Sequence, residues 1–276
     1  MLLCRSNLTS KIGAVNSADL RGPARNARWH TDGPAACLDD EEHMFHPTPS
    51  KPSPEPCLQR LKNETRARHG ALESRSVLLD PALSRERYLD CLCRFYGYYA
   101  PLELRLRGSP GWAEAGFAYA ARYKSALLAQ DLLALGLLPA RLHGLPSCSA
   151  LPTVETTAQL FGCLYVLEGA TLGGQIITRH LQASLGLTPE SGAAFFAGYG
   201  AQTGSRWKEF GAHLTAFALQ SGAGDAIVAS ANSTFETLDH WLYPERITAQ
   251  WVPAPLQATY PVPSPDSPRH AAASSP

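Results

Sequence analysis

One histidine in this sequence lies on a stripe of core-type residues. The stripe consists of Leu58, Leu61, Thr65, His69 and Leu72. These residues are three or four positions apart, as on one face of a helix, so we predict that the imidazole of His69 points into the core. An inward imidazole can coordinate a metal, or it can be a core histidine that is hydrogen-bonded to a backbone carbonyl.

Two cations precede this histidine on the same side of the helix. Lys62 and Arg66 stand seven and three residues before His69, which places them about two turns and one turn towards the N-terminus. A ligand with a central metal and carboxylates along one edge would meet all three groups, and heme has this shape. The alternative is that both cations only extend into water.

Three glycines interrupt a segment that otherwise has the pattern of one long helix. Gly169, Gly173 and Gly174 lie within residues 160–181, whose apolar residues have helical spacing. Each interior glycine costs about 1 kcal/mol relative to alanine, so the three cost roughly 3 kcal/mol of helix stability. Gly169 and Gly173 share a face, where bare backbone admits either a flat ligand or a closely packed second helix.

The elements that must position these residues are helices. Apolar residues recur at spacings of three and four, and clusters of Val, Ile and Thr do not alternate for long. The sequence therefore predicts an all-α fold, a single-domain multi-helix bundle. Ser84 is a predicted N-cap, and Thr188 followed by Pro189 predicts another helix start. The predicted helices are 58–79, 84–107 with a break near Pro101, 112–135, 154–186, 189–198, 205–220 and 225–243.

Proline marks the two ends of the chain. Seven of the 22 prolines fall within residues 1–57 and seven more within 253–276. Sequence of this kind cannot bury enough apolar area to offset the entropy of ordering. We therefore predict a disordered N-terminal extension over 1–56, a helical domain over 57–250 and a disordered tail over 251–276.

Charge and cysteine content exclude several classes of protein. The chain has 24 basic and 24 acidic residues, so no net field steers it towards nucleic acid. Its longest apolar runs, such as 132–138, are shorter than the roughly 18 residues of a membrane-spanning helix, which predicts a soluble protein without a membrane partner. Seven cysteines without a CxxC or a zinc-type spacing predict reduced thiols in a cytoplasmic protein.

Two segments taken together resemble a known family. The sequence L-K-N-E-T-R-A-R-H ends at His69, and Y-V-L-E-G-A-T-L-G-G-Q occupies 165–175. The pair resembles the two signature helices of heme oxygenases, in the same order, and the resemblance extends over residues 57–243. The second segment is most similar to the bacterial branch, which supplies biliverdin to bacteriophytochromes.

The resemblance implies a role for each of these residues. His69 corresponds to the proximal ligand of the heme iron. The glycine-rich helix of the family covers the distal heme face, which implies this role for Gly169, Gly173 and Gly174. Heme propionates are bound in the family by polar residues that correspond here to Lys62, Arg66 and Tyr165, with Arg206 or Lys208 as a further candidate.

The sequence departs from the animal members of this family at two positions. Their aspartate that organises the distal water network is replaced here by Ala170, and their late arginine would fall near Ala212. Without the carboxylate, we expect water held by backbone groups to carry protons at the distal face.

The implied activity is heme degradation. Heme b would be both cofactor and substrate, cleaved with O2 and reducing equivalents to biliverdin, carbon monoxide and ferrous iron. The electrons would come from a ferredoxin or flavodoxin type donor, and a bacteriophytochrome is the possible acceptor of biliverdin. Two other classes remain open: a heme-binding protein that stores heme without turnover, and a helical interaction module in which His69 and the glycines only pack.

Overall fold

The computed structural model of this chain describes residues 55–244. Every regular element in this range is a helix and none is a strand, so the predicted all-α class is confirmed for this part of the chain. The predicted disordered segments 1–56 and 251–276 lie outside the described residues, apart from Glu55 and Pro56.

The first predicted helix, 58–79, is divided into two. Helix α1 spans Cys57–Glu64 and helix α2 spans Arg66–Arg75, with Thr65 between them at φ −97° and ψ −4°. The Thr65 hydroxyl donates a hydrogen bond to the carbonyl of Leu61 at 2.6 Å. Such a bond from a side chain back to the preceding turn bends a helix, which accounts for the interruption.

Helix α3, Arg85–Arg107, runs through Pro101 without a break. The prediction of a break there was therefore wrong. Proline removes the N–H that would bond to the carbonyl of Gly97, four residues earlier, and this carbonyl instead accepts a hydrogen bond from the Cys148 N–H at 2.8 Å. The N-cap was predicted correctly, since the Ser84 side chain accepts from the Arg87 N–H at 3.2 Å.

One helix was predicted over 112–135, and this was also wrong. The structure has three short helices here: α4 (Gly111–Glu114), η1 (Tyr119–Arg122) and α5 (Ser125–Ala134). Gly116 has φ +60°, a left-handed conformation that ends the first of them. A further short helix, α6, follows at Pro139–Leu142.

The glycine-rich segment forms the longest described helix, α7, which spans Thr157–Leu185. A capping box at Thr156 opens it and the left-handed Gly186 closes it. The predicted helix 189–198 is divided into η2 (Pro189–Ala193) and α8 (Ala194–Ala197), because Gly192 has a φ of +125°. The remaining helices are η3 (Gly200–Gln202), α9 (Thr203–Ser221) and α10 (Gly224–Leu242).

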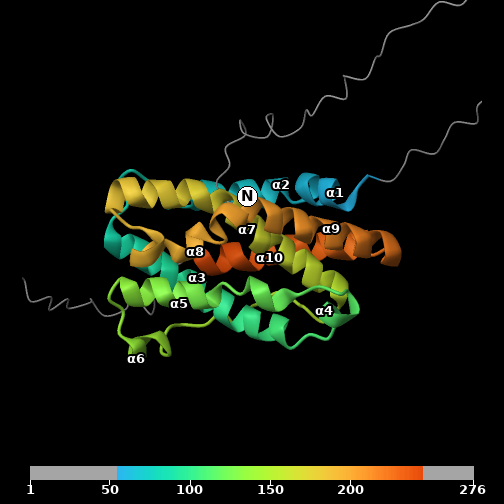
Figure 1. Cartoon of the computed structure of the whole chain (residues 1–276), viewed down its shortest axis with the longest axis horizontal. Coiled ribbons are helices and arrows are strands. Elements are labelled where there is room, and N and C mark those ends of the chain that lie inside the picture. The colour runs from blue at the N-terminus through green and yellow to red at the C-terminus, as the bar shows by residue number, and fades with distance from the viewer. Residues whose placement is uncertain (1–54, 245–276) are drawn as a thin grey trace, which may run out of the picture. The chain divides into compact units, whose positions relative to one another are not determined.

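Helices α7 and α10 pack along each other and form the core pair of the domain. In Figure 1, α1 and α2 lie along one edge of the bundle and α4 and α5 along the opposite edge, with α7 crossing between them. Helix α7 is long and apolar enough to cross a membrane, but 78% of its apolar window is buried inside the domain. It therefore has the burial of a core helix.

Candidate functional site

The stripe that carries the histidine faces the core as predicted. Leu61, Thr65 and Leu72 are at most 2% exposed, and the His69 side chain is 17% exposed. The backbone N–H of His69 donates to the Thr65 carbonyl at 3.0 Å, so the helical register continues across the interruption. The imidazole therefore lies at the inner side of α2, near the solvent boundary.

The contacts of His69 suit a metal ligand. Its Nδ1 lies 3.5 Å from Oε2 of Glu73, one turn later on α2, and its ring packs edge-on against Phe235 of α10 at 5.8 Å. A carboxylate at Nδ1 favours the tautomer with the proton on that nitrogen and makes Nε2 the basic one. This pairing of carboxylate and imidazole is typical of histidines that bind a metal through Nε2.

The two cations before His69 are exposed. Neither Lys62 nor Arg66 forms an ion pair with another residue in the range 55–244. Two cations on one side of a helix, one and two turns from the imidazole, can bind an anionic group that reaches the helix surface. Both predicted propionate-binding side chains are thus accessible to an anionic group.

Tyr165 joins the histidine helix to the glycine helix. It is 3% exposed on α7, and its hydroxyl is hydrogen-bonded to the side chain of Thr65, one turn before His69. Burial raises the pKa of this phenol. Its ring also packs against Trp207 of α9 at 5.8 Å, so three helices meet at Tyr165.

The three predicted glycines of α7 are all buried, but they do not share one role. A Cβ on Gly174 would overlap the carbonyl oxygen of Phe196 in α8, so this glycine is required for helix packing. We therefore remove Gly174 from the predicted heme-facing set. Gly169 and Gly173 lie together on another face, and their heme-facing role stays a prediction. Gly162, which the sequence did not single out, packs in the same way as Gly174, against Ile227 of α10.

The packing role of Gly174 leads to a stability prediction. Gly174→Ala should lower the free energy of unfolding by about 1–3 kcal/mol, because its methyl group would overlap the α8 backbone. Denaturant titration of the heme-free protein measures this. Gly204→Ala in α9 is the matched control: no atom lies within 4 Å of its Cβ, so the variant should be as stable as the parent or slightly more stable. Equal stability of Gly174→Ala and the parent would contradict the packing.

Arg206 and Lys208, the two candidates for a further propionate contact, lie on different sides of α9. Lys208 lines a surface groove between α1 and α9, together with Leu58, Trp207 and Ala212. Arg206 lies on another side of α9, where its guanidinium is 3.6 Å from Glu209. Only Lys208 therefore faces the helix that carries Lys62, and we retain it as the better candidate.

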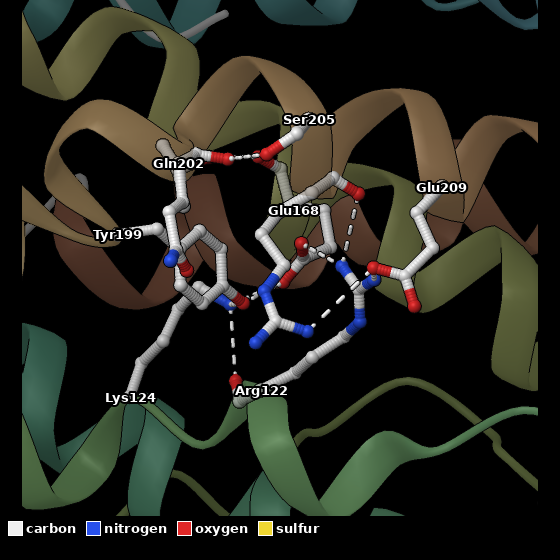
Figure 2. A network of polar contacts seen from close by, with 9 residues as sticks. Arg122, Lys124, Glu168, Tyr199, Gln202, Ser205 and Glu209 are labelled. Carbon is white, nitrogen blue, oxygen red and sulfur yellow. Dashed lines mark hydrogen bonds and ion pairs between the residues drawn. The ribbon is translucent and has the colours of Figure 1, made fainter.

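A network of buried charges centres on Glu168 of α7, and the sequence did not predict it. Arg122 Nη1 donates to Oε2 of Glu168 at 2.6 Å, and Lys124 Nζ donates to Oε1 at 2.5 Å. The Tyr199 hydroxyl donates to the same Oε1 at 2.7 Å, and Arg122 Nη2 is 3.0 Å from Glu209 (Figure 2). One signal was available: Glu168 is the only charged residue in 157–178.

A small pocket lies on the side of α7 that carries Ala170. Its lining includes Tyr99, Lys124, Ala170 and Thr171. The Tyr99 hydroxyl is buried and has no hydrogen-bond partner among the described residues, and burial raises its pKa, so it stays a neutral donor. A buried hydroxyl of this kind is the group that an ordered water satisfies.

The donor set fits a porphyrin better than a bare metal ion. Among residues 55–244 there is no group of three His, Cys, Asp or Glu side chains that could hold a metal ion. An iron in a porphyrin already has four nitrogen ligands, so it needs only one histidine from the protein. His69, with Glu73 at its Nδ1, can supply this one ligand. The exposed cations nearby can bind the carboxylates of a porphyrin, and the glycines of α7 carry no side chains that would obstruct it.

Comparison with known proteins gives one family. A model of the family described as Heme oxygenase matches residues 55–243. No curated protein sequence matches the chain. The described fold resembles heme oxygenase from Leptospira interrogans, with a TM-score of 0.57 and 18% identity over 68% of this chain and 98% of that one.

Two further solved structures resemble the fold. The NO- and CO-bound heme oxygenase of Neisseria meningitidis has a TM-score of 0.54 and 22% identity, over 67% of this chain and 89% of that one. Heme oxygenase-1 of Synechocystis in complex with heme has a TM-score of 0.55 and 16% identity, over 72% and 95% respectively. At these identities the likeness concerns the fold.

Proposed function

This chain belongs to the heme oxygenase family, and on that premise we propose that it cleaves heme b with O2 to biliverdin, carbon monoxide and ferrous iron. The electrons come from an external donor. Heme would lie between the helix of His69 and the glycine helix, as both substrate and cofactor.

The observation that carries this proposal is the meeting of the two signature segments. The hydroxyls of Tyr165 and Thr65 are hydrogen-bonded, so the turn before Gly169 lies against the turn before His69. The proposed iron ligand, His69, and the glycines of α7 are thereby held close together, from segments far apart in the sequence. A family match places the chain in the family, whereas this contact supports a heme site made by these residues.

Different side chains would bind the iron and the propionates of the heme. His69 Nε2 would coordinate the iron and Glu73 would hold the ring orientation through Nδ1. Lys62, Arg66 and Lys208 would bind the propionates as exposed cations. Tyr165 would exchange its bond to Thr65 for one to a propionate.

On the heme face covered by α7, the protein would leave room for dioxygen and supply protons. When bound, the heme itself supplies the site where dioxygen is activated. The absence of side chains at Gly169 and Gly173 would admit dioxygen and confine it to one direction. The Tyr99 hydroxyl would hold a water beside Ala170. The sequence predicted that backbone groups hold the distal water, and Tyr99 would add a side-chain donor to them.

Hemin titration followed by reduction tests the proposal. A heme ligated by histidine gives a sharp Soret band, and ascorbate or a reductase system should then convert it to biliverdin and release carbon monoxide. A stable heme complex that never turns over would favour the second candidate, a heme storage protein, which the alanine at position 170 permits. A Soret band that stays as broad as that of free hemin would exclude both.

Three finer assignments belong to this proposal. The electron donor would be a ferredoxin or flavodoxin, the biliverdin acceptor a bacteriophytochrome, and the compartment the cytoplasm. The reduced thiols support the last of these, since the five described cysteines are all free. Turnover supported by a reduced ferredoxin, and transfer of biliverdin to an apo-bacteriophytochrome, test the first two.

The propionate assignment predicts a specific effect on affinity. Lys62→Ala and Arg66→Ala should each raise the Kd for hemin by about three- to tenfold with an unchanged Soret band, because an exposed charged hydrogen bond contributes roughly 1 kcal/mol. Hemin dimethyl ester, which lacks the carboxylates, should bind both variants as well as it binds the parent. Arg85→Ala, an exposed cation at the start of α3, is the control. An equal loss of affinity for the ester would show that the cations do not act through propionate.

A further inference from the structure

Glu168 fastens the glycine helix to two other parts of the fold. Its side chain is 1% exposed and accepts from Arg122 and Lys124, which belong to the η1–α5 connection. It also accepts from the Tyr199 hydroxyl, which lies between α8 and α9. Figure 2 shows these three donors converging on one carboxylate from two sides.

The Lys124 ammonium is fully bonded within the network. Lys124 Nζ has three protons and three acceptors, namely Glu168 Oε1 at 2.5 Å, the Arg122 carbonyl at 3.1 Å and the Tyr199 hydroxyl at 3.2 Å. An ammonium group whose three protons are all used does not attract a further ligand. Buried ion pairs also add little net stability compared with apolar packing, and the best-supported use of such groups is to select one arrangement of the chain.

The attachment lies where α7 is most easily deformed. Glu168 directly precedes Gly169, and glycines reduce the resistance of a helix to bending. The Thr171 hydroxyl donates to the Glu168 carbonyl at 2.7 Å, a back-bond that also favours bending. Without an external attachment, the turn at Gly169 could adopt several directions.

We propose that Glu168 is a positioning residue, which fixes the direction of α7 at Gly169 and thereby selects the meso carbon at which the ring opens. This inference rests on the proposed function. Glu168 does not contact heme in this scheme. It acts through Arg122, Lys124 and Tyr199, which hold the helix in one rotation relative to the rest of the domain.

Two variants and one control test this. Glu168→Gln removes the charge that both cations require, and Tyr199→Phe removes a single donor and should fold even if the first variant does not. Tyr98→Phe is the matched control: Tyr98 of α3 is also fully buried, and its hydroxyl is hydrogen-bonded to the Thr234 carbonyl at 3.2 Å and the Thr237 hydroxyl at 2.8 Å, both in α10 and outside the Glu168 network.

Two quantities are measured on each protein. In the heme-free state, hydrogen exchange of the backbone amides of 169–174 should accelerate about tenfold or more in Glu168→Gln and less in Tyr199→Phe, relative to amides of α3. In the loaded enzyme, the ratio of the main biliverdin isomer to the others should fall roughly tenfold in Glu168→Gln. Tyr98→Phe should lose stability without either change.

The outcomes separate this inference from the proposed function. Unchanged exchange at 169–174 in both variants would show that no attachment is lost. Faster exchange with an unchanged isomer ratio would show that the attachment does not direct ring opening. Either result overturns the proposal. A parental protein that forms no biliverdin refutes the proposed function, and the selection of a meso carbon with it.

Discussion

His69→Ala will lose the sharp Soret band of the heme complex and reduce biliverdin formation roughly a hundredfold or more, while part of the heme affinity remains. The iron then lacks its protein ligand, whereas Lys62, Arg66 and the apolar surroundings do not depend on the iron bond. Absorption spectra after hemin addition, with single-turnover formation of biliverdin, measure both effects. Added imidazole should restore part of the spectrum and of the turnover.

Other histidines of the domain provide the controls. His180 Nε2 lies 3.1 Å from the Asp80 carbonyl, and the His213 ring packs against Phe117 at 5.3 Å, so both have structural contacts of their own. His180→Ala and His213→Ala should therefore keep the parental spectrum. If His69→Ala degraded heme at the parental rate without imidazole, the ligand would have to be sought elsewhere.

Gly173→Leu has the second large effect. If α7 covers the open face of the heme, the new side chain will fill the space that dioxygen needs, and turnover should fall roughly a hundredfold while the heme stays on His69. If Gly173 only permits helix packing, the variant should instead lose about 1–3 kcal/mol of stability and keep its turnover per folded molecule. Melting temperature and turnover, measured on the same sample, distinguish these results.

Gly162, a glycine of the same helix that packs against α10, provides the control. Gly162→Ala would bring a Cβ into the carbonyl of Ile227, so it should destabilise the domain and leave turnover per folded molecule unchanged. The affinity of the reduced heme complex for carbon monoxide provides a second measure, which should fall in Gly173→Leu alone. A Gly173→Leu protein that behaves like Gly162→Ala would remove Gly173 from the distal face.

The helical class and most long helices followed from local patterns. Periodic apolar residues placed α7, α9 and α10 within three residues of their observed bounds, and Ser84 was identified as a cap. The error at Pro101 arose because a distant segment supplies what the local sequence lacks. Pro101 stays inside α3 because the Cys148 N–H donates a hydrogen bond to the Gly97 carbonyl, which the proline leaves without its helical donor.

The candidate site was predictable to a similar extent. The spacing of Leu61, Thr65 and His69 predicted an inward imidazole, and the structure places it there. The spacing could not show that Glu73 lies at Nδ1, because an exposed pair at i and i+4 and a functional pair have the same pattern in sequence.

The sequence by itself determined which residues share a face of each helix, because a helix turns by the same angle at every residue whatever surrounds it. Only the tertiary structure decided which faces meet. Gly174 proved to contact α8, Lys208 to face α1, and Glu168 to bind cations from the η1–α5 connection. These contacts join segments far apart in the chain, and they depend on the rotation and crossing of whole helices, which no local spacing encodes.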